Sequence, residues 1–281
     1  MAWWSIRLRV LAAVLAGFLP MSLSAAAEPT ARGHAAVERT SACKISASVP
    51  SLAPWLERTR ARLAQHEALT IVAIGSSSTY GAGASSTAAS YPSRLEALLK
   101  EQFPGTSIKV LNRGVNGQEA AQMLARFDSD VIARNPDLVL WQVGTNAVLR
   151  DPTVAGEARL IRSGIERLKS TGADVLLIDP QYAPRVLKKP EAHRMVDLIG
   201  IEAREAGTGV FHRFALMRDW YETQRLPFAT FVSADGLHLN DWGYDCVARN
   251  LAAAIAKAAA RPTLAAEVSR TNAFGPEISR Q

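Results

Sequence analysis

The sequence lacks an apolar run long enough to cross a membrane. The stretch VLAAVLAGFL, residues 10–19, is ten residues long, whereas a membrane-spanning helix needs about 20. Basic RLR at 7–9 precedes it and small SAAA at 24–27 follows it, which is the pattern of a secretory signal peptide. We therefore predict a cleaved signal peptide over residues 1–27, with an uncleaved membrane anchor as the alternative. The mature chain is then expected in a bacterial periplasm or outside the cell, with no stable membrane span.

The sequence also lacks a strong excess of one charge. Removal of residues 1–27 takes away two arginines and no acid, so the formal net charge falls from +6 to +4. This mild, scattered charge is not typical of nucleic-acid-binding proteins, and we expect no nucleic-acid partner. The densest basic cluster is interpreted as a solvated loop and not as a polyanion site. Its members are Arg185, Lys188 and Lys189.

Cysteine is scarce, with only Cys43 and Cys246 present. Two cysteines with no histidine at ligand spacing do not favour a metal site. Both lie in the part of the chain predicted to be exported, where such a pair usually forms a disulfide. We predict the Cys43–Cys246 bond, which would close a loop of about 200 residues and add up to about 5 kcal/mol of stability. The alternative is two separate buried thiols.

The remaining chain divides into three parts. Residues 28–50 form a polar, Ala/Ser-rich arm, and residues 261–281 form a tail without periodicity that is expected to be loose. Residues 51–260 make up the predicted catalytic domain. With 48% apolar and 21% charged residues, the composition is that of a globular protein with a core.

Short apolar runs alternate with helical patterns along this domain. Such alternation predicts an α/β fold, a doubly wound three-layer α/β/α domain with about five parallel strands. In such sheets ligands bind beyond the carboxyl ends of the strands. The predicted strands are 69–75, 108–114, 137–144, 173–179 and 209–214. Helices are predicted at 91–103 and 241–260, and amphipathic helical patterns run through 154–168 and 192–206.

Polar residues cluster directly after these strands. Ser76, Ser77 and Ser78 follow the first strand, and SADGLHLNDWG at 233–243 follows the last. Acyl transfer by serine needs a histidine base, an orienting carboxylate and donors for the oxyanion. His238 is the histidine of this edge that has an acid at short fixed spacing, since Asp235 precedes it by three residues.

Other residues have simpler interpretations. Asp179 is a rival orienting acid, but its place before Pro180 favours a turn at a strand end. His212 falls inside a predicted strand and is interpreted as a core residue, while His193 is placed on an outer helix face. The serine cluster is not a P-loop, because no lysine follows its glycines.

Four short blocks, each after a predicted strand, resemble the SGNH (GDSL-type) hydrolase family over about residues 69–255. The blocks are IGSSST, NRGVNGQE, GTNA and DGLH. The resemblance implies a flavodoxin-like hydrolase fold and a catalytic triad of Ser77, His238 and Asp235, with no metal or organic cofactor. It further implies an oxyanion hole built from Ser77, Gly117 and Asn146.

Two positions depart from the family pattern. Ser76 stands where the family has aspartate after the glycine, and Ala147 stands where it has the last aspartate of the third block. Neither position belongs to the implied triad. We expect hydrogen bonds that brace the site to be lost, with the hydroxyls of Ser76 and Ser78 taking over part of that role.

These observations predict an exported serine esterase that removes O-acetyl or other short acyl groups from a carbohydrate. Its partner would be a small acylated or saccharide substrate. Four aromatic residues lie near this edge: Tyr80, Trp141, Tyr182 and Trp242. Aromatic faces can stack on sugar rings, but for Trp141, which falls inside a predicted strand, packing in the core is favoured. One alternative is a lipase or thioesterase, but the sequence has no evident long apolar lid segment, which counts against long-chain lipids. The other alternative is a weakly catalytic carbohydrate- or cell-wall-binding protein.

Overall fold

A computed structural model of the protein describes Cys43, residues 56–150 and residues 154–260. The predicted signal peptide (1–27), nearly all of the predicted arm (28–50) and the predicted tail (261–281) lie outside the described residues. Among the helices of the described part, none is long and apolar enough to cross a membrane.

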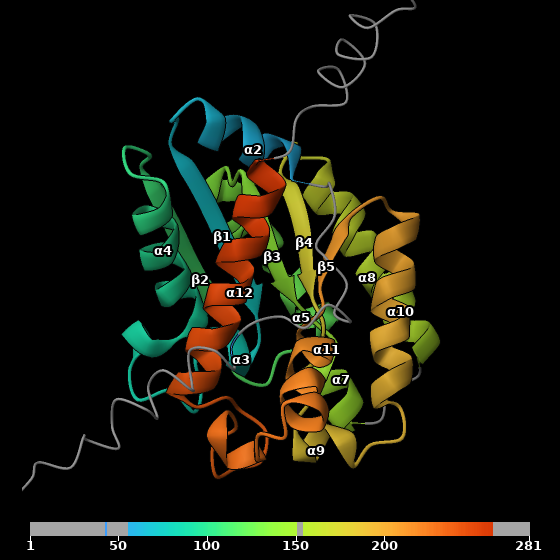
Figure 1. The fold of residues 1–281 in the computed structure, drawn as a ribbon. Helices are drawn as coiled ribbons and strands as arrows, with labels where there is room; N and C mark the ends of the chain where they lie inside the picture. Colours follow the sequence, from blue (N-terminus) through green and yellow to red (C-terminus); the bar gives the residue numbers. More distant parts are fainter. Residues whose placement is uncertain (1–42, 44–55, 151–153, 261–281) are drawn as a thin grey trace, which may run out of the picture. The chain divides into compact units, whose positions relative to one another are not determined.

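A five-stranded parallel sheet forms the centre of the domain, in the order β2-β1-β3-β4-β5 (Figure 1). The chain adds strands outward from β1 in one direction and then in the other, so the sheet is doubly wound. The sequence prediction of the fold class is therefore confirmed. The strands are β1 (Leu69–Gly75), β2 (Ile108–Gly114), β3 (Leu138–Gln142), β4 (Asp174–Ile178) and β5 (Gly209–Phe211).

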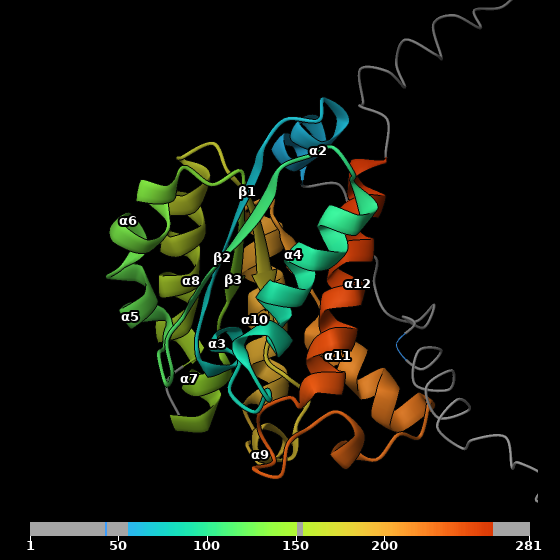
Figure 2. The same ribbon diagram turned by 90° about the vertical axis from the view of Figure 1, so that its left-hand side faces the viewer.

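Helices cover both faces of the sheet. Figure 2 shows α4 and α12 together on one side of the strands and α5, α6 and α8 on the other, while α10 packs against α8 and β5. The helices are α2 (Glu57–Ala64), α3 (Ser77–Tyr80), α4 (Tyr91–Gln102), α5 (Ala120–Leu124), α6 (Phe127–Asp130), α7 (Thr145–Arg150), α8 (Val154–Lys169), α9 (Pro184–Leu187), α10 (Ala192–Glu205), α11 (Arg213–Arg218) and α12 (Asp241–Ala259). Short 3-10 turns are η1 (Thr87–Ala89), η2 (Ile132–Arg134) and η4 (Phe228–Thr230), and η3 (Asp219–Thr223) is a π-helix.

The apolar patterns of the sequence form the core. All five residues of β3 are buried, and Ile161, Ile165 and Leu168 of α8 point into the same core with no exposed surface. Burial of one such aliphatic side chain contributes about 1.5–3 kcal/mol. The helical period read across 154–168 is thus confirmed for the described side chains.

Capping residues set the ends of two predicted helices. Pro92 lies in the first turn of α4, where its missing N–H costs no hydrogen bond. Asn240 is the N-cap of α12, and its side-chain oxygen accepts the N–H of Gly243 at 3.0 Å. Both helices end within a residue of the predicted boundary, at Gln102 and Ala259.

The fifth strand was predicted too long. β5 ends at Phe211, and α11 begins at Arg213, so only residues 209–211 of the segment 209–214 form a strand, and its last two residues begin a helix. His212, predicted to lie inside the strand, is the N-cap residue of α11. The physical reason is a contact from another strand, since the buried carboxylate of Asp179 accepts the N–H of Phe214 at 2.8 Å and favours a helix start there.

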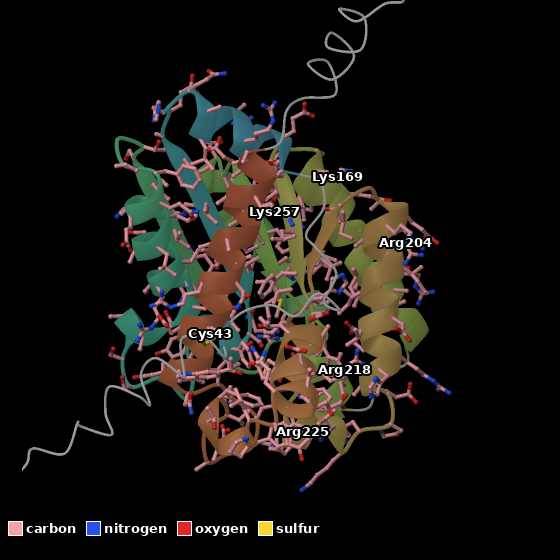
Figure 3. All side chains as sticks on the ribbon, in the orientation of Figure 1. Cys43, Lys169, Arg204, Arg218, Arg225 and Lys257 are labelled. Carbon is pink, nitrogen blue, oxygen red and sulfur yellow. A yellow bond between two sulfur atoms is a disulfide. The ribbon has the colours of Figure 1, made fainter. Side chains whose placement is uncertain are left out.

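A disulfide joins Cys43 to Cys246 of α12, as predicted, with their Cα atoms 5.2 Å apart. Figure 3 shows Cys43 beside this helix. The side-chain amide of Asn250 donates to the carbonyl oxygens of Cys43 at 2.6 Å and Cys246 at 2.8 Å. The bond and these contacts fix position 43 to the last helix.

Candidate active site

Ser77 lies where β1 turns into α3, at the carboxyl end of the sheet (Figure 1). The turn is tight because α3 packs directly on β2. A Cβ atom added to Gly114 would lie 2.0 Å from the backbone nitrogen of Tyr80 and 2.6 Å from the carbonyl carbon of Thr79. Only glycine fits at position 114, so this residue fixes how closely α3, and Ser77 with it, approaches the sheet.

Ser77, His238 and Asp235 lie in one line of hydrogen bonds. The Ser77 Oγ atom lies 2.7 Å from Nε2 of His238, although the two residues are 161 positions apart. On the other side of the ring, Nδ1 lies 2.5 Å from Oδ2 of Asp235. With its proton on Nδ1, the imidazole donates to the carboxylate and leaves Nε2 to accept the Ser77 hydroxyl. This is the geometry that a serine nucleophile and its base require.

Asp235 is held as a carboxylate. Burial opposes its ionisation, but a hydrogen bond from the His238 ring outweighs it, together with further donors to the other oxygen. Oδ1 accepts the N–H of Leu237 and of His238, each at 2.9 Å, and the hydroxyl of Ser233 at 2.8 Å. These bonds hold the pKa of Asp235 well below its ordinary value. A negative charge beside Nδ1 stabilises the protonated imidazole.

Asp179, the rival acid, has a different place. Besides accepting the N–H of Phe214, its carboxylate lies 3.4 Å from Nδ1 of His212. It is buried directly after β4, and the carboxylate that contacts the His238 ring is that of Asp235. The interpretation of Asp179 as a residue that shapes a strand end therefore agrees with its contacts.

A pocket of about 410 Å³ opens at Ser77 and His238. Within the described residues, the N–H groups of Ser77 and Gly117 donate to no other backbone group, and Gly117 has a φ of +76°, which suits glycine. Asn146 also lines this pocket. Four of the five residues implied for the site thus share one cavity, and Asp235 lies behind His238. The lining is Ser77, Ala82, Asn116, Gly117, Asn146, Leu149, Arg150, Arg185, Leu237 and His238.

Hydrogen bonds brace the serine cluster from below. Ser76 donates to Oε1 of Gln142 with its N–H at 2.8 Å and its hydroxyl at 2.9 Å. Ser78 Oγ accepts from the buried guanidinium of Arg213 at 2.9 Å. Both serines therefore make bracing contacts, as expected, whereas Ala147 is buried and contributes none.

Three buried polar residues that support the site were not predicted from the sequence: Gln142, Arg213 and Gln181. Arg213 also donates to Oε1 of Gln181 at 2.9 Å and to the carbonyl of Asp179 at 3.0 Å. Burial lowers the pKa of Arg213, and the nearby Asp179 carboxylate offsets this. A polar Gln142 inside an otherwise apolar strand was the one signal available, because buried polar groups need partners.

The four aromatic residues near the edge differ in their burial and contacts. Trp141 is fully buried, as favoured from the sequence, and Tyr182 is buried with its hydroxyl bonded to Glu222 at 2.7 Å. Tyr80 is half exposed. Trp242 lines a second, larger hollow of about 730 Å³, formed by Gly83, Ala84, Ser85, Ala229, Thr230, Asn240, Asp241 and Trp242. This hollow borders the first pocket, since a Cβ on Gly83 would lie 2.9 Å from the His238 Cβ.

The known proteins to which this chain is similar are esterases. A curated acetylxylan esterase from Geobacillus stearothermophilus is 37% identical over 60 residues, which are 21% of this chain and 27% of that protein. Among solved structures, a two-domain esterase active on acetylated mannans matches with a TM-score of 0.64 at 20% identity, covering 75% of this chain and 55% of the other. The Geobacillus stearothermophilus acetylxylan esterase Axe2 matches with a TM-score of 0.57 at 21% identity, covering 69% and 97%.

The matched segment is about a quarter of the curated relative, and the chain spans about half of the two-domain esterase. At these identities the structural matches establish the fold, which agrees with the parallel sheet described above. Family membership rests on a longer match. The model of the Non-GDSL lipase-like family matches residues 42–261, well over half of the sequence, and the chain belongs to that family.

Proposed function

We propose that this protein is an exported carboxylic ester hydrolase in which Ser77 is the nucleophile, His238 the general base and Asp235 the orienting acid. The observation that carries the proposal is the pair of contacts at the imidazole, 2.7 Å to Ser77 Oγ and 2.5 Å to Asp235 Oδ2. The relatedness to acetylxylan and acetylmannan esterases supports the same reaction class.

In this mechanism Ser77 Oγ attacks the ester carbonyl while Nε2 of His238 takes its proton. Asp235 stabilises the resulting imidazolium, because its carboxylate is ionised and hydrogen-bonded to the ring. The imidazolium then gives the proton to the departing alcohol oxygen. Water cleaves the acyl-enzyme by the same proton path in reverse and regenerates the Ser77 hydroxyl.

The oxyanion would be held by three donors at the pocket wall: the N–H of Ser77, the N–H of Gly117 and the amide of Asn146. All three residues line the cavity that Ser77 faces. Preorganised donors of this kind lower the barrier by about 3 kcal/mol each.

For the substrate we propose an O-acetylated carbohydrate. The related proteins are an acetylxylan esterase and an esterase active on acetylated mannans. The hollow beside His238 offers the exposed part of Trp242 together with Asn240 and Thr230, a mixture of aromatic surface and polar groups that suits a sugar ring. A polymer bound in this hollow would present an acetyl group to the smaller pocket.

Export is part of the proposal. The Cys43–Cys246 disulfide is the bond expected of a protein in an oxidising compartment, and it agrees with the signal-peptide pattern of residues 1–27. Mass spectrometry of the protein recovered from the periplasm or medium tests this. A mature N-terminus near residue 28 is expected, and an intact N-terminus on a membrane-bound chain would contradict it.

The experiment that tests catalysis compares the wild type with Ser77→Ala on p-nitrophenyl acetate. We expect the variant to lose at least about 10³-fold in kcat, as serine hydrolases do when the nucleophile is removed. Ser129→Ala, a change of the same kind on the exposed surface, is the control and should keep wild-type rates. Equal rates for Ser77→Ala and the wild type would overturn the mechanism and favour a carbohydrate-binding protein.

A panel of substrates then separates acyl hydrolysis of sugars from that of lipids. Acetate release from acetylated xylan and mannan is expected to exceed turnover of p-nitrophenyl esters with long acyl chains. A rate that rises with chain length would contradict the carbohydrate assignment and favour a lipase or thioesterase.

A further inference from the structure

The pocket at Ser77 is lined by two arginines, Arg150 and Arg185, and by no acidic residue. Asp235 is next to His238 but its two oxygens are already bonded to His238, Leu237 and Ser233. A neutral acetyl ester does not require a cation. The charge at this cavity therefore calls for an explanation beyond the hydrolysis proposed above.

The two arginines differ in how far their charge is compensated. Arg150 forms an ion pair with Glu119 and donates to the carbonyl oxygen of Gly117 at 2.9 Å. Its contacts explain it as a support for the loop that carries Gly117. Arg185 is exposed and has no ion pair or side-chain hydrogen bond within the described residues. The uncompensated positive charge of the pocket is therefore that of Arg185.

Arg185 is fixed relative to the loop that carries His238. Its backbone N–H donates to the carbonyl of Gly236 at 3.0 Å, and a Cβ added to Gly236 would lie 3.7 Å from its Cγ. The side-chain stem thus lies close to Gly236, the residue that directly follows Asp235. Arg185 is exposed, as expected for a solvated basic residue. It lies in the short helix α9 and not in a loop, and it lines the pocket, which Lys188 and Lys189 do not.

We propose that Arg185 binds a carboxylate of the substrate, and that this carboxylate belongs to the alcohol part of the ester, as in an O-acetylated uronic acid. This inference rests on the proposed function. In the proposed mechanism the alcohol oxygen must lie at His238, which returns the proton to it, whereas the carbonyl oxygen lies at the proposed oxyanion donors, Gly117 and Asn146. A cation beside the His238 loop consequently faces the alcohol and not the acyl group.

The test uses polygalacturonate that is chemically O-acetylated, together with the same polymer after methyl esterification of its carboxylates. Acetate release is measured, so hydrolysis of the methyl esters does not interfere. For the wild type we expect kcat/KM to be about 2- to 5-fold higher on the free acid, through KM, as a guanidinium–carboxylate pair at an exposed site gives. The preference should shrink in 0.5 M salt, which screens exposed charges.

In Arg185→Gln we expect the ratio of kcat/KM on the free acid to kcat/KM on the methyl ester to fall to about one. Loss of a single ion pair explains a change of this size. Lys188→Gln removes the same charge three residues away and outside the pocket lining, and it should keep the wild-type preference. Because each variant is compared on two substrates, a general loss of activity or folding cancels from the ratio. Equal rates on both polymers for the wild type, or a preference that survives in Arg185→Gln, would overturn the proposal.

Two further arms keep the outcomes separate. Preference for p-nitrophenyl succinate over p-nitrophenyl butyrate, lost in Arg185→Gln, would place the carboxylate in the acyl group and refute the assignment to the alcohol. Calorimetric binding of oligogalacturonate and its methyl ester to Ser77→Ala needs no hydrolysis. Binding of oligogalacturonate but not of its methyl ester, lost when Arg185→Gln is added, would support the carboxylate site even if the wild type proves inactive on esters. If the free acid is not bound selectively, the carboxylate site is refuted and the proposed esterase activity is not.

Discussion

The side-chain amide of Asn146 donates to the main-chain carbonyl of Gln118 at 2.9 Å. This bond ties the first turn of α7, which follows β3, to the loop that follows β2. It uses one of the two amide hydrogens, and the residue lines the pocket at Ser77. The second hydrogen is therefore available to a substrate oxygen, while the first fixes the direction in which it points.

Replacement of Asn146 by alanine should lower kcat by about 10²- to 10³-fold, the cost of losing one oxyanion donor. KM should change little, because the developing charge exists only in the transition state. Steady-state kinetics on p-nitrophenyl acetate measures both constants. A rise in KM with unchanged kcat would instead assign Asn146 to substrate binding.

Asp235→Asn should lower kcat by about 10⁴-fold, as loss of the orienting carboxylate does in serine hydrolases. The variant also tests the lowered pKa of Asp235. Since the folded-state pKa lies below the ordinary value of about 3.9, the charged carboxylate stabilises the fold above that pH, and this stability is lost as the pH falls through the folded-state pKa. Melting temperatures of both proteins from pH 2 to 6 check this. The wild-type advantage should be full above about pH 5 and shrink as the pH falls to 2, and an advantage independent of pH would contradict it.

The sheet could be predicted from the sequence because buried parallel strands are short apolar runs, and β1 and β2 have the predicted bounds of 69–75 and 108–114. The end of β5 could not, because the helix start at Arg213 depends on Asp179 from a different strand. Local pattern carries no information about such a contact.

The residues implied for the site follow strand ends, and parallel topology brings strand ends together. That is why Ser77, Gly117, Asn146 and His238 could be placed on one edge before their distances were known. The buried polar residues that support them could not be predicted in this way. Gln142 and Arg213 act through partners 66 and 135 positions away, and only the folded chain shows which polar group each one satisfies. The same holds for Arg185, because its place in the pocket lining depends on its contact with Gly236 and not on its charged neighbours in sequence.

Gly114→Ala should damage the site without a change to any group proposed to act in catalysis. The added methyl would lie 2.0 Å from the backbone of Tyr80, so α3 and Ser77 must move away from β2. Overpacking of this kind costs about 1–3 kcal/mol of stability, and a displacement of about 1 Å at the nucleophile costs about 10²-fold in rate. Thermal unfolding and p-nitrophenyl acetate hydrolysis measure the two effects.

Gly200→Ala is the matched control for that substitution. Gly200 lies inside α10, and no atom lies within 4 Å of an added Cβ. Alanine should stabilise the helix by about 1 kcal/mol and leave the rate unchanged. If both variants behaved alike, close packing of α3 on β2 would not be what positions Ser77.

Loss of the disulfide should lower stability by about 2–5 kcal/mol, because the bond closes a long loop and restricts the unfolded chain. The two cysteines are 203 positions apart, and Cys246 is fully buried in α12. Chemical denaturation of Cys43→Ala/Cys246→Ala beside the wild type gives the difference in free energy of unfolding.

A reducing agent should destabilise the wild type and leave the double variant unaffected, which separates the effect of the bond itself from that of the packing of its side chains. Neither cysteine is among the residues that line the pocket at Ser77, so kcat on p-nitrophenyl acetate should stay within about twofold at a temperature where both proteins are folded. A double variant as stable as the wild type would show that the contacts of Asn250 with the carbonyls of Cys43 and Cys246 suffice to hold position 43 on the helix.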